Sequence, residues 1–307
     1  MTNNWQPTCS IDALKFRAKF LAKIRSFFAE RHVIEVETPL LSQHTVTDPY
    51  IESFQVDDRF LQTSPEYAMK RLLAAGSGPI YQIAKAFRHS EQGHQHNPEF
   101  SMLEWYRPGF DYMNLIEEID ELLQFILNTL PADKISYQDL FIEKLSIDPL
   151  NCSLDTLHNL LKKNNIDQYE DFDTSLQLLL THLIEPTLGL EKPIFIFDFP
   201  ASQSALAKLK NKKIAERFEA YYKNQEIANG WTELGDAKEQ QQRFEANQKQ
   251  RRLKIKIIPK IDSHLINALK SGFPECSGVA MGVDRLIMLA QNTNKISEVI
   301  SFDWTNA

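Results

Sequence analysis

Two strand-like segments that flank a long polar loop constrain the fold of this chain most strongly. Residues 80–88, IYQIAKAFR, alternate apolar and polar side chains, and residues 100–106, FSMLEWY, can pair back on them. The segment between them, SEQGHQHNP, is rich in turn-forming residues. A second pair of strands is expected within residues 217–230, RFEAYYKNQEIANG. Such hairpins outnumber strand–helix–strand units, which predicts an α+β fold with a largely antiparallel sheet.

Helices and further strands are expected around these hairpins. Ser10 is a candidate N-cap for an amphipathic helix over residues 11–31. Other helices are predicted over residues 66–75, 113–130 (ended by Pro131), from about Ser204, and over 236–252. Short strands are predicted at 33–36, which Pro39 ends, and at PIFIFDF from Pro193, and Gly282 marks the change from strand to helix near the C-terminus. Residues 132–190 suggest Leu-rich helical pieces without chemistry.

Composition limits the class of protein. The chain has 307 residues, of which 43% are hydrophobic, and 34 basic against 41 acidic residues give a formal net charge of −7. This composition is typical of a soluble globular protein, and the acidic balance argues against broad binding of nucleic acid. Cys9, Cys152 and Cys276 form no CxxC pair, and neither a secretory signal nor a membrane-spanning run is visible. We therefore expect a cytoplasmic protein without disulfides.

Four polar clusters are candidates for chemistry, and each has a simpler interpretation. Ser64, Pro65 and Glu66 could form a binding site or only a helix cap. A second cluster, an active loop or a solvated hairpin tip, contains Arg88, His89, His94, His96, Asn97 and Glu99. The third could bind Mg²⁺ or an amine, or be surface acids: Glu219, Glu226, Glu233 and nearby Asn229. In the fourth, after Gly282, Arg285 could bind phosphate or form a surface salt bridge with Asp284 or another acid.

Taken together, the clusters favour one kind of reaction. Two arginines can hold a triphosphate, acids can hold Mg²⁺, and buried carboxylates can hold a substrate ammonium. These are the needs of an ATP-dependent activation of a carboxylate. The sequence contains no GxxxxGK[ST], GxGxxG or GxSxG motif, so side chains must hold the phosphates.

At these positions the chain resembles the catalytic domain of class II aminoacyl-tRNA synthetases, and within them the lysyl-tRNA synthetase branch. VIEVETPLL, with Pro39, is similar to the first class II motif, residues 87–106 to the second, and residues 278–290 to the third. SPEYAMKRLL from Ser64 and EIANGWTEL from Glu226 are similar to the lysine-pocket segments. The resemblance implies a single catalytic domain over residues 1–307, a six- or seven-stranded antiparallel sheet flanked by helices, and a homodimer built around the first motif.

The resemblance also implies roles for individual residues. Arg88 would contact the α-phosphate, Arg285 the γ-phosphate, and Phe100 the adenine ring, which makes the two arginines the catalytic residues. The implied ATP-binding positions are Arg88, His89, Ser90, His96, Asn97, Phe100, Glu226, Ile227, Gly282 and Arg285. Magnesium would be held by Glu219 and Glu226. The implied positions for a lysine-like substrate are Ser64, Pro65, Glu66, Glu104, Tyr106, Asn229, Glu233 and Ala280.

One position departs from the family pattern. The second motif usually has Arg-x-Glu, with the glutamate on the adenine amino group, but this chain has Arg88, His89 and Ser90, with Glu91 one step later. Two alternatives follow. Either Ser90 and backbone groups contact adenine, or a shift of the loop brings Glu91 there.

The acceptor is expected to be a protein. The first motif begins within about ten residues of Met1, which suggests that no anticodon-binding barrel precedes it. A catalytic domain of this kind resembles the elongation factor P lysine ligases, which adenylate (R)-β-lysine and transfer it to a lysine of elongation factor P. Ala280, where the tRNA synthetases of this branch have glycine, favours that subfamily, because its methyl group would crowd an α-amino group more than a β-amino group.

Three alternatives remain open. A truncated lysyl-tRNA synthetase would need a basic face, and the only candidates are the lysines between Lys208 and Lys213 and the segment from Arg251 to Lys256, which we expect to be solvated helix ends. An enzyme like ammonia-dependent asparagine synthetase would need an arginine where this pocket offers Glu104 and Glu233. A non-catalytic regulatory paralogue would have lost an arginine or a metal-binding acid.

Overall fold

The computed structural model describes residues 5–254 and 257–307 and divides into two compact units. The first unit comprises Met1–Gly109 and Leu234–Ala307, and the second comprises Phe110–Glu233. Each unit contains a four-stranded sheet segment with helices against it, so the predicted α+β class is confirmed.

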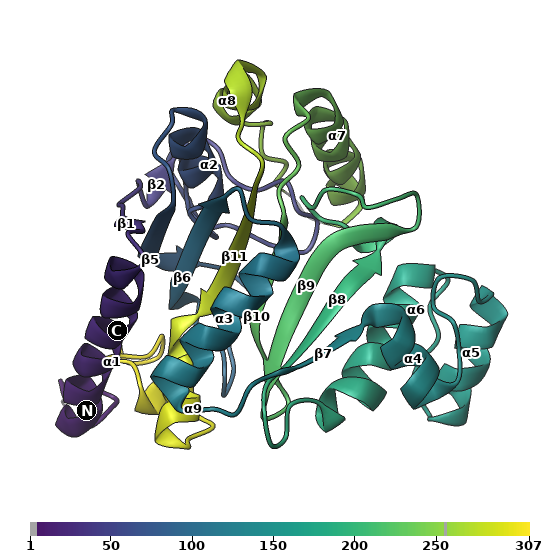
Figure 1. Ribbon diagram of the computed structural model, residues 1–307, viewed down its shortest axis with the longest axis horizontal. Helices are drawn as coiled ribbons and strands as arrows, with labels where there is room; N and C mark the ends of the chain where they lie inside the picture. Colours follow the sequence, from purple (N-terminus) through teal and green to yellow (C-terminus); the bar gives the residue numbers. More distant parts are fainter. Residues whose placement is uncertain (1–4, 255–256) are drawn as a thin grey trace. The chain divides into compact units, whose positions relative to one another are not determined.

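The first unit is built on the strands β1 (Ile34–Glu35), β5 (Ile80–Phe87), β6 (Glu99–Pro108) and β11 (Cys276–Gly282), in the order β1-β5-β6-β11 (Figure 1). Strands β5 and β6 form the expected antiparallel hairpin, and β6 pairs antiparallel with β11. In this register Glu104 on β6 lies opposite Gln82 on one side and Ala280 on the other. Directly opposite residues share a face of a sheet, so these three side chains are neighbours.

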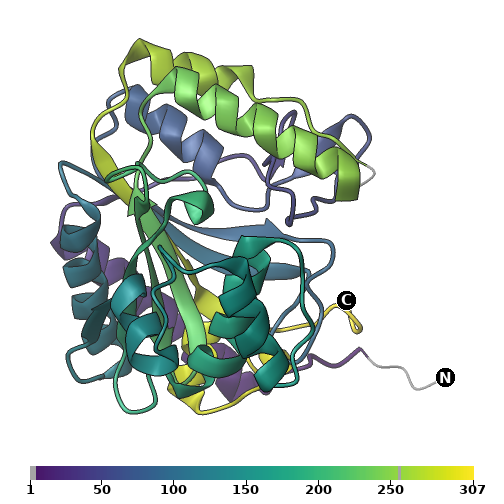
Figure 2. The ribbon, with the colours of Figure 1, turned by 90° about the vertical axis from the view of Figure 1, so that its right-hand side faces the viewer.

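Five helices and a small second sheet complete the first unit. The helices are α1 (Ile11–Glu30), α2 (Glu66–Ala74), α7 (Ala237–Lys254), α8 (Ser263–Gly272) and α9 (Val283–Gln291), with a short helical turn at Ile296–Glu298. Helix α8 packs beside α2 and α7 (Figure 2). The small sheet has the order β2-β4-β3, from Leu41–Ser42, Arg59–Leu61 and Gln55–Val56.

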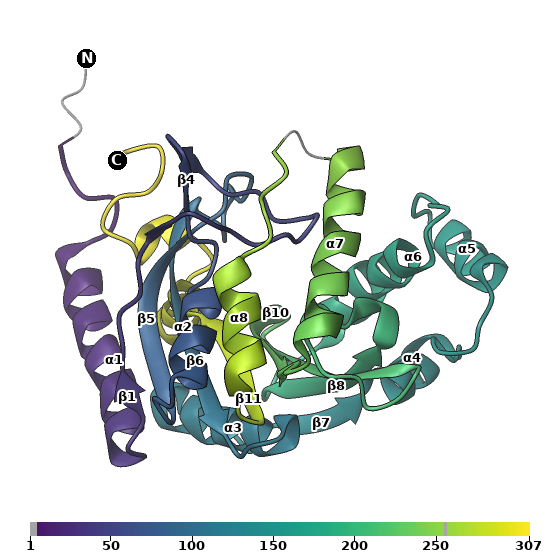
Figure 3. The ribbon, with the colours of Figure 1, turned by 90° about the horizontal axis from the view of Figure 1, so that it is seen from above.

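Helix α1 begins and packs as the sequence predicts. The Ser10 hydroxyl accepts a hydrogen bond from the Ala13 amide at 3.1 Å, which caps the first turn. Phe28, on the apolar face, stacks on Tyr81 of β5 at 4.4 Å between ring centroids and meets the edge of Trp105 of β6 at 5.3 Å. These aromatic contacts hold α1 against the sheet (Figure 3).

The second unit has the strand order β10-β9-β8-β7, with β7 at Asp133–Ser136, β8 at Ile194–Pro200, β9 at Ile214–Tyr222 and β10 at Gln225–Thr232. Strands β9 and β10 are the second expected hairpin. The helices of this unit are α3 (Tyr112–Leu127), α4 (Tyr137–Leu145), α5 (Leu154–Lys163) and α6 (Phe172–Leu179), with short turns at 180–187 and 201–203. Leucine and aromatic side chains of the segment between 132 and 190, among them Tyr137 and Phe141, form a core together with Phe199 of β8.

Several details differ from the expectation. The two units together contribute eight strands to these sheet segments in the described chain, rather than six or seven, because the short edge strands β1 and β7 are included. Both edge strands pair in parallel, with β5 and β8 respectively, while the other pairings within each unit are antiparallel. Helix α3 ends at Leu127 rather than near residue 130, and its C-cap Asn128 adopts the left-handed conformation three residues before Pro131.

The helix predicted from about Ser204 does not form. Lys208 donates its backbone N–H to the Thr232 carbonyl at 2.8 Å, and Lys210 donates to the Ile214 carbonyl at 2.9 Å. Ala205 has φ of +48°. The backbone groups of this segment are thus satisfied by neighbouring strands instead of by a helix.

Candidate active site

Arg88 stands directly after β5, at the base of the polar loop. Its guanidinium lies 5.2 Å from the centroid of the Phe100 ring, and its Nη1 is 3.2 Å from Glu91 Oε1. The backbone N–H of Arg88 donates to the Pro98 carbonyl at 2.9 Å, which closes the loop across its base. The hairpin therefore brings together an arginine and an aromatic ring, the two groups expected for the α-phosphate and the adenine of ATP.

The loop that carries the departure from the family pattern is anchored on residues 52–54. The His89 N–H donates to the Glu52 carbonyl at 2.9 Å, and the His89 ring packs against Phe54 at 4.9 Å. Ser90 Oγ lies 3.5 Å from a Glu52 carboxylate oxygen. The Glu91 carboxylate is paired with Arg88, so adenine contact by Glu91 requires that this ion pair be exchanged.

Asn97 and His96 lie at the far end of the loop. The Asn97 amide donates to the Glu99 carbonyl at 2.6 Å, and its oxygen accepts the Trp304 backbone N–H at 2.8 Å. His96 Nε2 is 2.5 Å from Nη2 of Arg285. Desolvation lowers the pKa of His96, and the Arg285 charge lowers it further, so the neutral ring is favoured and accepts this hydrogen bond.

Arg285 extends from the first turn of α9, and Gly282 is the N-cap of that helix. A Cβ at Gly282 would only reach ordinary contact, 3.6 Å, with the Arg285 side chain. The neighbouring Asp284 is buried, and both of its oxygens are engaged: Oδ1 by Arg17 and Oδ2 by the Ser101 backbone N–H. Asp284 is thus an interior residue, and its carboxylate is bonded to Arg17 and Ser101.

Glu66 occupies the first helical position of α2, after Ser64 and Pro65. Ser64 Oγ accepts the Glu66 N–H at 3.2 Å, while Pro65 takes the N-cap position without a side-chain bond. Glu66 is buried and forms an ion pair with buried Lys70, one helical turn later, at 2.6 Å between Oε1 and Nζ. The carboxylate is thus an internal acid that already binds an ammonium group.

A second buried carboxylate of the first unit belongs to Glu104. Its exposed fraction is 2%, and its Oε1 accepts a hydrogen bond from the Tyr106 hydroxyl at 2.7 Å. The Ala280 methyl group lies on the same face, because Ala280 is directly opposite in the β6–β11 register. A buried carboxylate favours a cationic ligand, since burial without charge compensation costs several kcal/mol (roughly 3–5 when a partner is removed).

The second unit carries the other acids on the face of the β9–β10 hairpin. Glu219 and Asn229 are opposite in register, as are Tyr221 and Glu226. Tyr221 donates its hydroxyl to Glu219 Oε2 at 2.7 Å, and Arg217 pairs with Oε1 of the same carboxylate. Desolvation raises the pKa of Tyr221 well above its usual value, and Glu219 and Glu226 raise it further. These two acids thus share one face of the hairpin.

The remaining predicted positions of this unit lie on β10 and just after it. Ile227 is buried at an irregularity in the β9–β10 register. Glu233 follows β10, is buried, and accepts a hydrogen bond from the Trp231 indole at 2.8 Å. Spacing by seven residues therefore does not mark a helical stripe. It places Glu219 and Glu226 on paired strands, and Glu233 after the second strand.

The oxygen ligands of Glu219, Glu226 and Asn229 fit a magnesium ion by chemistry. Arg217 forms an ion pair with Oε1 of Glu219, so a metal would compete with this guanidinium for the carboxylate. Among the residues that the structure describes, no group of three or more His, Cys, Asp or Glu side chains forms a ready metal site. Two protein carboxylates together with phosphate oxygens are, however, the usual way in which Mg²⁺ is bound beside a nucleotide.

Lys70 and Arg217 are two site residues that sequence reasoning did not identify. Lys70 follows Glu66 by four residues, the spacing at which helical side chains meet. Arg217 precedes Glu219 by two residues, which in a strand places both on one face. Both signals are visible in the sequence once the local element is known.

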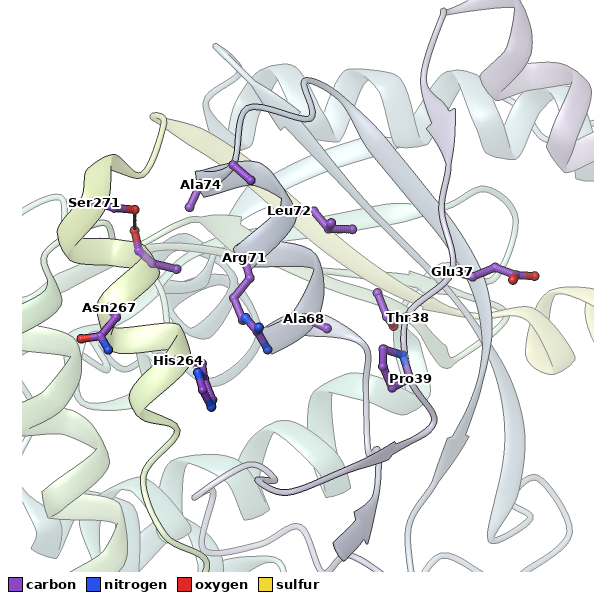
Figure 4. Close-up of a pocket in the computed structure, with 12 residues that line it drawn as sticks. Glu37, Thr38, Pro39, Ala68, Arg71, Leu72, Ala74, His264, Asn267 and Ser271 are labelled. Carbon is purple, nitrogen blue, oxygen red and sulfur yellow. Dashed lines mark hydrogen bonds between the residues drawn. The ribbon is translucent and has the colours of Figure 1, made fainter.

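A separate hollow of about 550 Å³ lies between α2, α8 and residues 37–39 of the first unit (Figure 4). Arg71 and His264 line it from the two helices, and Ala68 and Ala268 are among its small apolar lining residues. The candidate site positions described above are not among its lining residues. The hollow is thus distinct from the groups that are predicted to hold ATP.

Comparison with known proteins shows the family of the chain. Residues 8–306 match the family model of class II tRNA synthetases (D, K and N). An elongation factor P--(R)-beta-lysine ligase of Photorhabdus laumondii is 51% identical over 100% of this chain and 99% of its own length. Ligases of the same name from Salmonella arizonae and Salmonella gallinarum are 49% and 50% identical over 98% of each chain. The chain belongs to this family of class II synthetase-like ligases.

Membership in this family makes the chain an ATP-dependent ligase. A member that binds tRNA would need a basic surface, and the structure describes part of the first segment predicted to provide one. Arg251 is not a solvated helix end: its exposed fraction is 1%, and it donates to the carbonyls of Ile51 at 2.8 Å, Ile257 at 3.0 Å and Asp48. Desolvation lowers the pKa of Arg251. Residues 255 and 256 of this basic segment lie outside the described residues.

The second candidate for a basic tRNA-binding face lies on the second unit. The lysines at 208, 210, 212 and 213 are exposed, as expected, but on the irregular segment rather than on a helix end. Lys210 pairs with Asp198 at 2.9 Å. In the part of the chain that is described, no helix is both long and apolar enough to cross a bilayer.

Proposed function

We propose that this chain activates (R)-β-lysine with ATP and transfers it to the ε-amino group of a lysine of elongation factor P. The observation that carries this proposal is the near-complete, 51% identical match to a ligase of that name. The match extends over 100% of this chain, so it spans both the segments proposed to bind the nucleotide and those that carry the acids. Burial of Arg251 takes this arginine out of the candidate tRNA-binding face, which favours a protein acceptor.

The proposed reaction has two steps. The substrate carboxylate attacks the α-phosphorus of ATP, a new P–O bond forms, and the bond to pyrophosphate breaks. The ε-amine of the acceptor lysine then attacks the adenylate carbonyl, loses a proton, and displaces AMP. Arg88 offsets the negative charge that develops on the α-phosphate, Phe100 stacks on adenine, and Arg285 holds the γ-phosphate.

Magnesium is proposed to be held by Glu219 and Glu226, and it supplies positive charge to the triphosphate when bound. Their placement on opposed strands, with Asn229 beside Glu219, supports this assignment. Arg217 neutralises Glu219 when the metal is not there.

The amino groups of the substrate are proposed to bind the buried acids. Glu66 takes the amine nearest the carboxylate, and Glu104 and Tyr106, with Asn229 and Glu233, take the distal ammonium. The support in the first unit is the position of Glu104, which is buried, accepts a hydrogen bond from the Tyr106 hydroxyl and lies opposite Ala280. Glu66 already pairs with Lys70, so the substrate amine would share this carboxylate with that ammonium. Ala280, directly opposite Glu104, adds bulk next to this acid.

Three broader properties complete the proposal. One family model spans residues 8–306, which supports a single catalytic domain despite the two compact units. A homodimer is proposed from the first motif, where Ile34, Leu40 and Leu41 are exposed. A cytoplasmic location is supported by the three cysteines, all of which are free thiols.

Mass spectrometry of purified elongation factor P tests the function directly. The acceptor is incubated with this protein, Mg²⁺, ATP and either (R)-β-lysine or α-lysine, and tRNA is tested in parallel. We expect the acceptor to gain the mass of one lysyl group, preferentially with the β-isomer. An unmodified acceptor together with charged tRNA would show that the truncated tRNA synthetase is the correct alternative.

Two variants make this experiment specific to the site. Arg88→Gln is expected to slow adenylate formation by about 10²-fold or more, since it removes charge stabilisation of the transition state. Lys162→Gln removes an exposed cation from α5, where the candidate site has no member, and serves as the matched control. If this chain is a non-catalytic regulatory paralogue, neither the parent protein nor the Lys162→Gln control forms an adenylate.

A further inference from the structure

We propose that Arg17 of helix α1 is a positioning residue for the ATP site, an inference that rests on the proposed function. Arg17 lies outside the segments to which nucleotide contacts are assigned. It nevertheless joins the strand that carries Phe100 to the helix that carries Arg285. Its guanidinium sets how far apart these two ATP-binding side chains are held.

The contacts of Arg17 connect four segments of the first unit. Nη1 is 2.6 Å from Asp284 Oδ1 and 3.3 Å from the Val299 carbonyl oxygen. Nη2 is 2.7 Å from Ser101 Oγ. The Asp284 Oδ2 atom accepts the Ser101 backbone N–H at 2.7 Å. Arg17, Ser101 and Asp284 thus form a closed triangle of hydrogen bonds.

This triangle stands where the sheet loses a strand. Gly282, the last residue of β11, pairs with Met102, so β6 continues toward Phe100 with β5 alone as its strand partner in the first unit. The Ser101 N–H meets the Asp284 carboxylate instead of a strand carbonyl. At Ser101, the residue next to Phe100, the Asp284 carboxylate therefore supplies the acceptor that a neighbouring strand would otherwise supply. Arg17 holds this carboxylate in place.

The same carboxylate fixes the start of α9. Asp284 lies in the first turn of this helix, where a negative charge is favourable, and Arg285 is the next residue. Any movement of Asp284 relative to Ser101 changes the distance between the adjacent Arg285 and Phe100. Misplacement by about 1 Å is enough to impair a preorganised site by up to roughly 10²-fold.

Arginine is the side chain that suits this place. Asp284 is 2% exposed and Ser101 is 5% exposed, so both need internal partners. The planar guanidinium presents two nitrogens in a fixed fork, one to Asp284 and the other to Ser101. A lysine would keep the charge but could not hold both partners in this fixed geometry.

The test compares ATP binding with amino-substrate binding in Arg17→Lys and Ser101→Ala. Titration calorimetry with ATP and ATP–pyrophosphate exchange are measured for each, with thermal unfolding as a check on folding. We expect the Kd and KM for ATP to rise by about tenfold in Arg17→Lys and by less in Ser101→Ala. The KM for β-lysine is expected to stay within about twofold, because the amine-binding acids are not part of the triangle.

Two further proteins separate positioning from folding. Lys15→Met removes an exposed cation of the same helix, paired only at the surface with Asp12, and should bind ATP like the parent. The double variant Arg17→Met, Asp284→Asn leaves no uncompensated buried charge, so its stability should exceed that of Arg17→Met alone while its ATP affinity remains low.

The outcomes decide the proposal. Unchanged ATP affinity in Arg17→Lys and in the double variant overturns it. An equal rise of the KM for ATP and the KM for β-lysine, in step with a loss of thermal stability, also overturns it. A parent protein that folds but does not bind ATP contradicts the proposed function itself. The two failures are therefore distinguishable, because only the second appears in the parent.

Discussion

Ala280 is the residue at which the choice between lysine isomers is expected to be made. The β6–β11 register places Ala280 directly opposite Glu104, on the same face of the sheet. Ala280→Gly is expected to shift the ratio of kcat/KM values toward α-lysine by about tenfold, since one methyl group in a substrate pocket discriminates by about 1–3 kcal/mol. ATP–pyrophosphate exchange with each isomer measures this ratio.

A matched substitution controls for the cost of glycine in a strand. Ala228 is buried in β10, whereas Ala280 is half-buried in β11, and Ala228 lies opposite Ala220, on the face away from Glu219; Ala228→Gly therefore introduces glycine into a strand away from the amine-binding acids. It should lower stability without changing the ratio. An unchanged ratio in Ala280→Gly would show that another residue selects the isomer.

Arg285 contributes to the lowered pKa of His96. Desolvation is the larger cause of the lowered His96 pKa, and the positive charge of Arg285 is the next. Replacing Arg285 with Met removes only the second cause, so the pKa of His96 should rise part of the way to the ordinary histidine value. Titration of the His96 ring by NMR measures it; a constant or lower pKa would contradict the 2.5 Å contact between these side chains.

At the scale of elements, helix α2 depends on its buried ion pair. Lys70→Met leaves the Glu66 carboxylate buried without this ammonium, and we expect the free energy of unfolding to fall by about 3–5 kcal/mol. Urea denaturation measures the change. The double variant Glu66→Gln, Lys70→Met should recover most of the stability but not the binding of the amino substrate, which distinguishes the structural from the substrate role of Glu66.

Edge strand β1 is the element on which the proposed homodimer depends. Ile34 is 54% exposed there, and strand β1 has β5 on one side only. Ile34→Asp should convert a dimer to a monomer in size-exclusion chromatography with light scattering, because a charge would be buried at the interface. Leu130→Asp, an exposed apolar residue of the second unit, is the control, and a dimeric Ile34→Asp protein would exclude this interface.

At the scale of the whole molecule, nucleotide binding should stabilise the folded chain. ATP with Mg²⁺ at one hundred times its Kd adds about 2.7 kcal/mol to the free energy of unfolding. Scanning calorimetry should therefore show a Tm that rises by a few degrees with ligand. Arg88→Gln should lose most of this rise and Lys162→Gln none of it; equal shifts in all three proteins would place ATP elsewhere.

Much of the fold follows from local patterns in the sequence. Hairpin β5–β6, helix α1 and the β11–α9 junction have the periods, caps and glycines that such elements require. The segment from Ser204 was wrongly predicted as a helix, because its propensity is overridden by bonds to the Thr232 and Ile214 carbonyls. Long-range hydrogen bonds of that kind leave no periodic signal.

The candidate site divides in the same way. The arginines and most of the acids stood out in the sequence as polar clusters that suit a reaction with ATP. Phe100 and Glu104 were assigned by the family likeness alone, which also gave the roles of the other residues. The tertiary structure alone decided that Arg251 is interior, and that Asp284 bonds to Arg17 rather than acting as a surface acid. Arg17 and Asp284 are 267 residues apart, and no local rule pairs them.

The sequence by itself determined which elements and reactive groups exist, since these depend on neighbouring residues. Which charged groups become buried partners was decided by packing, because burial depends on segments that meet only in the folded chain.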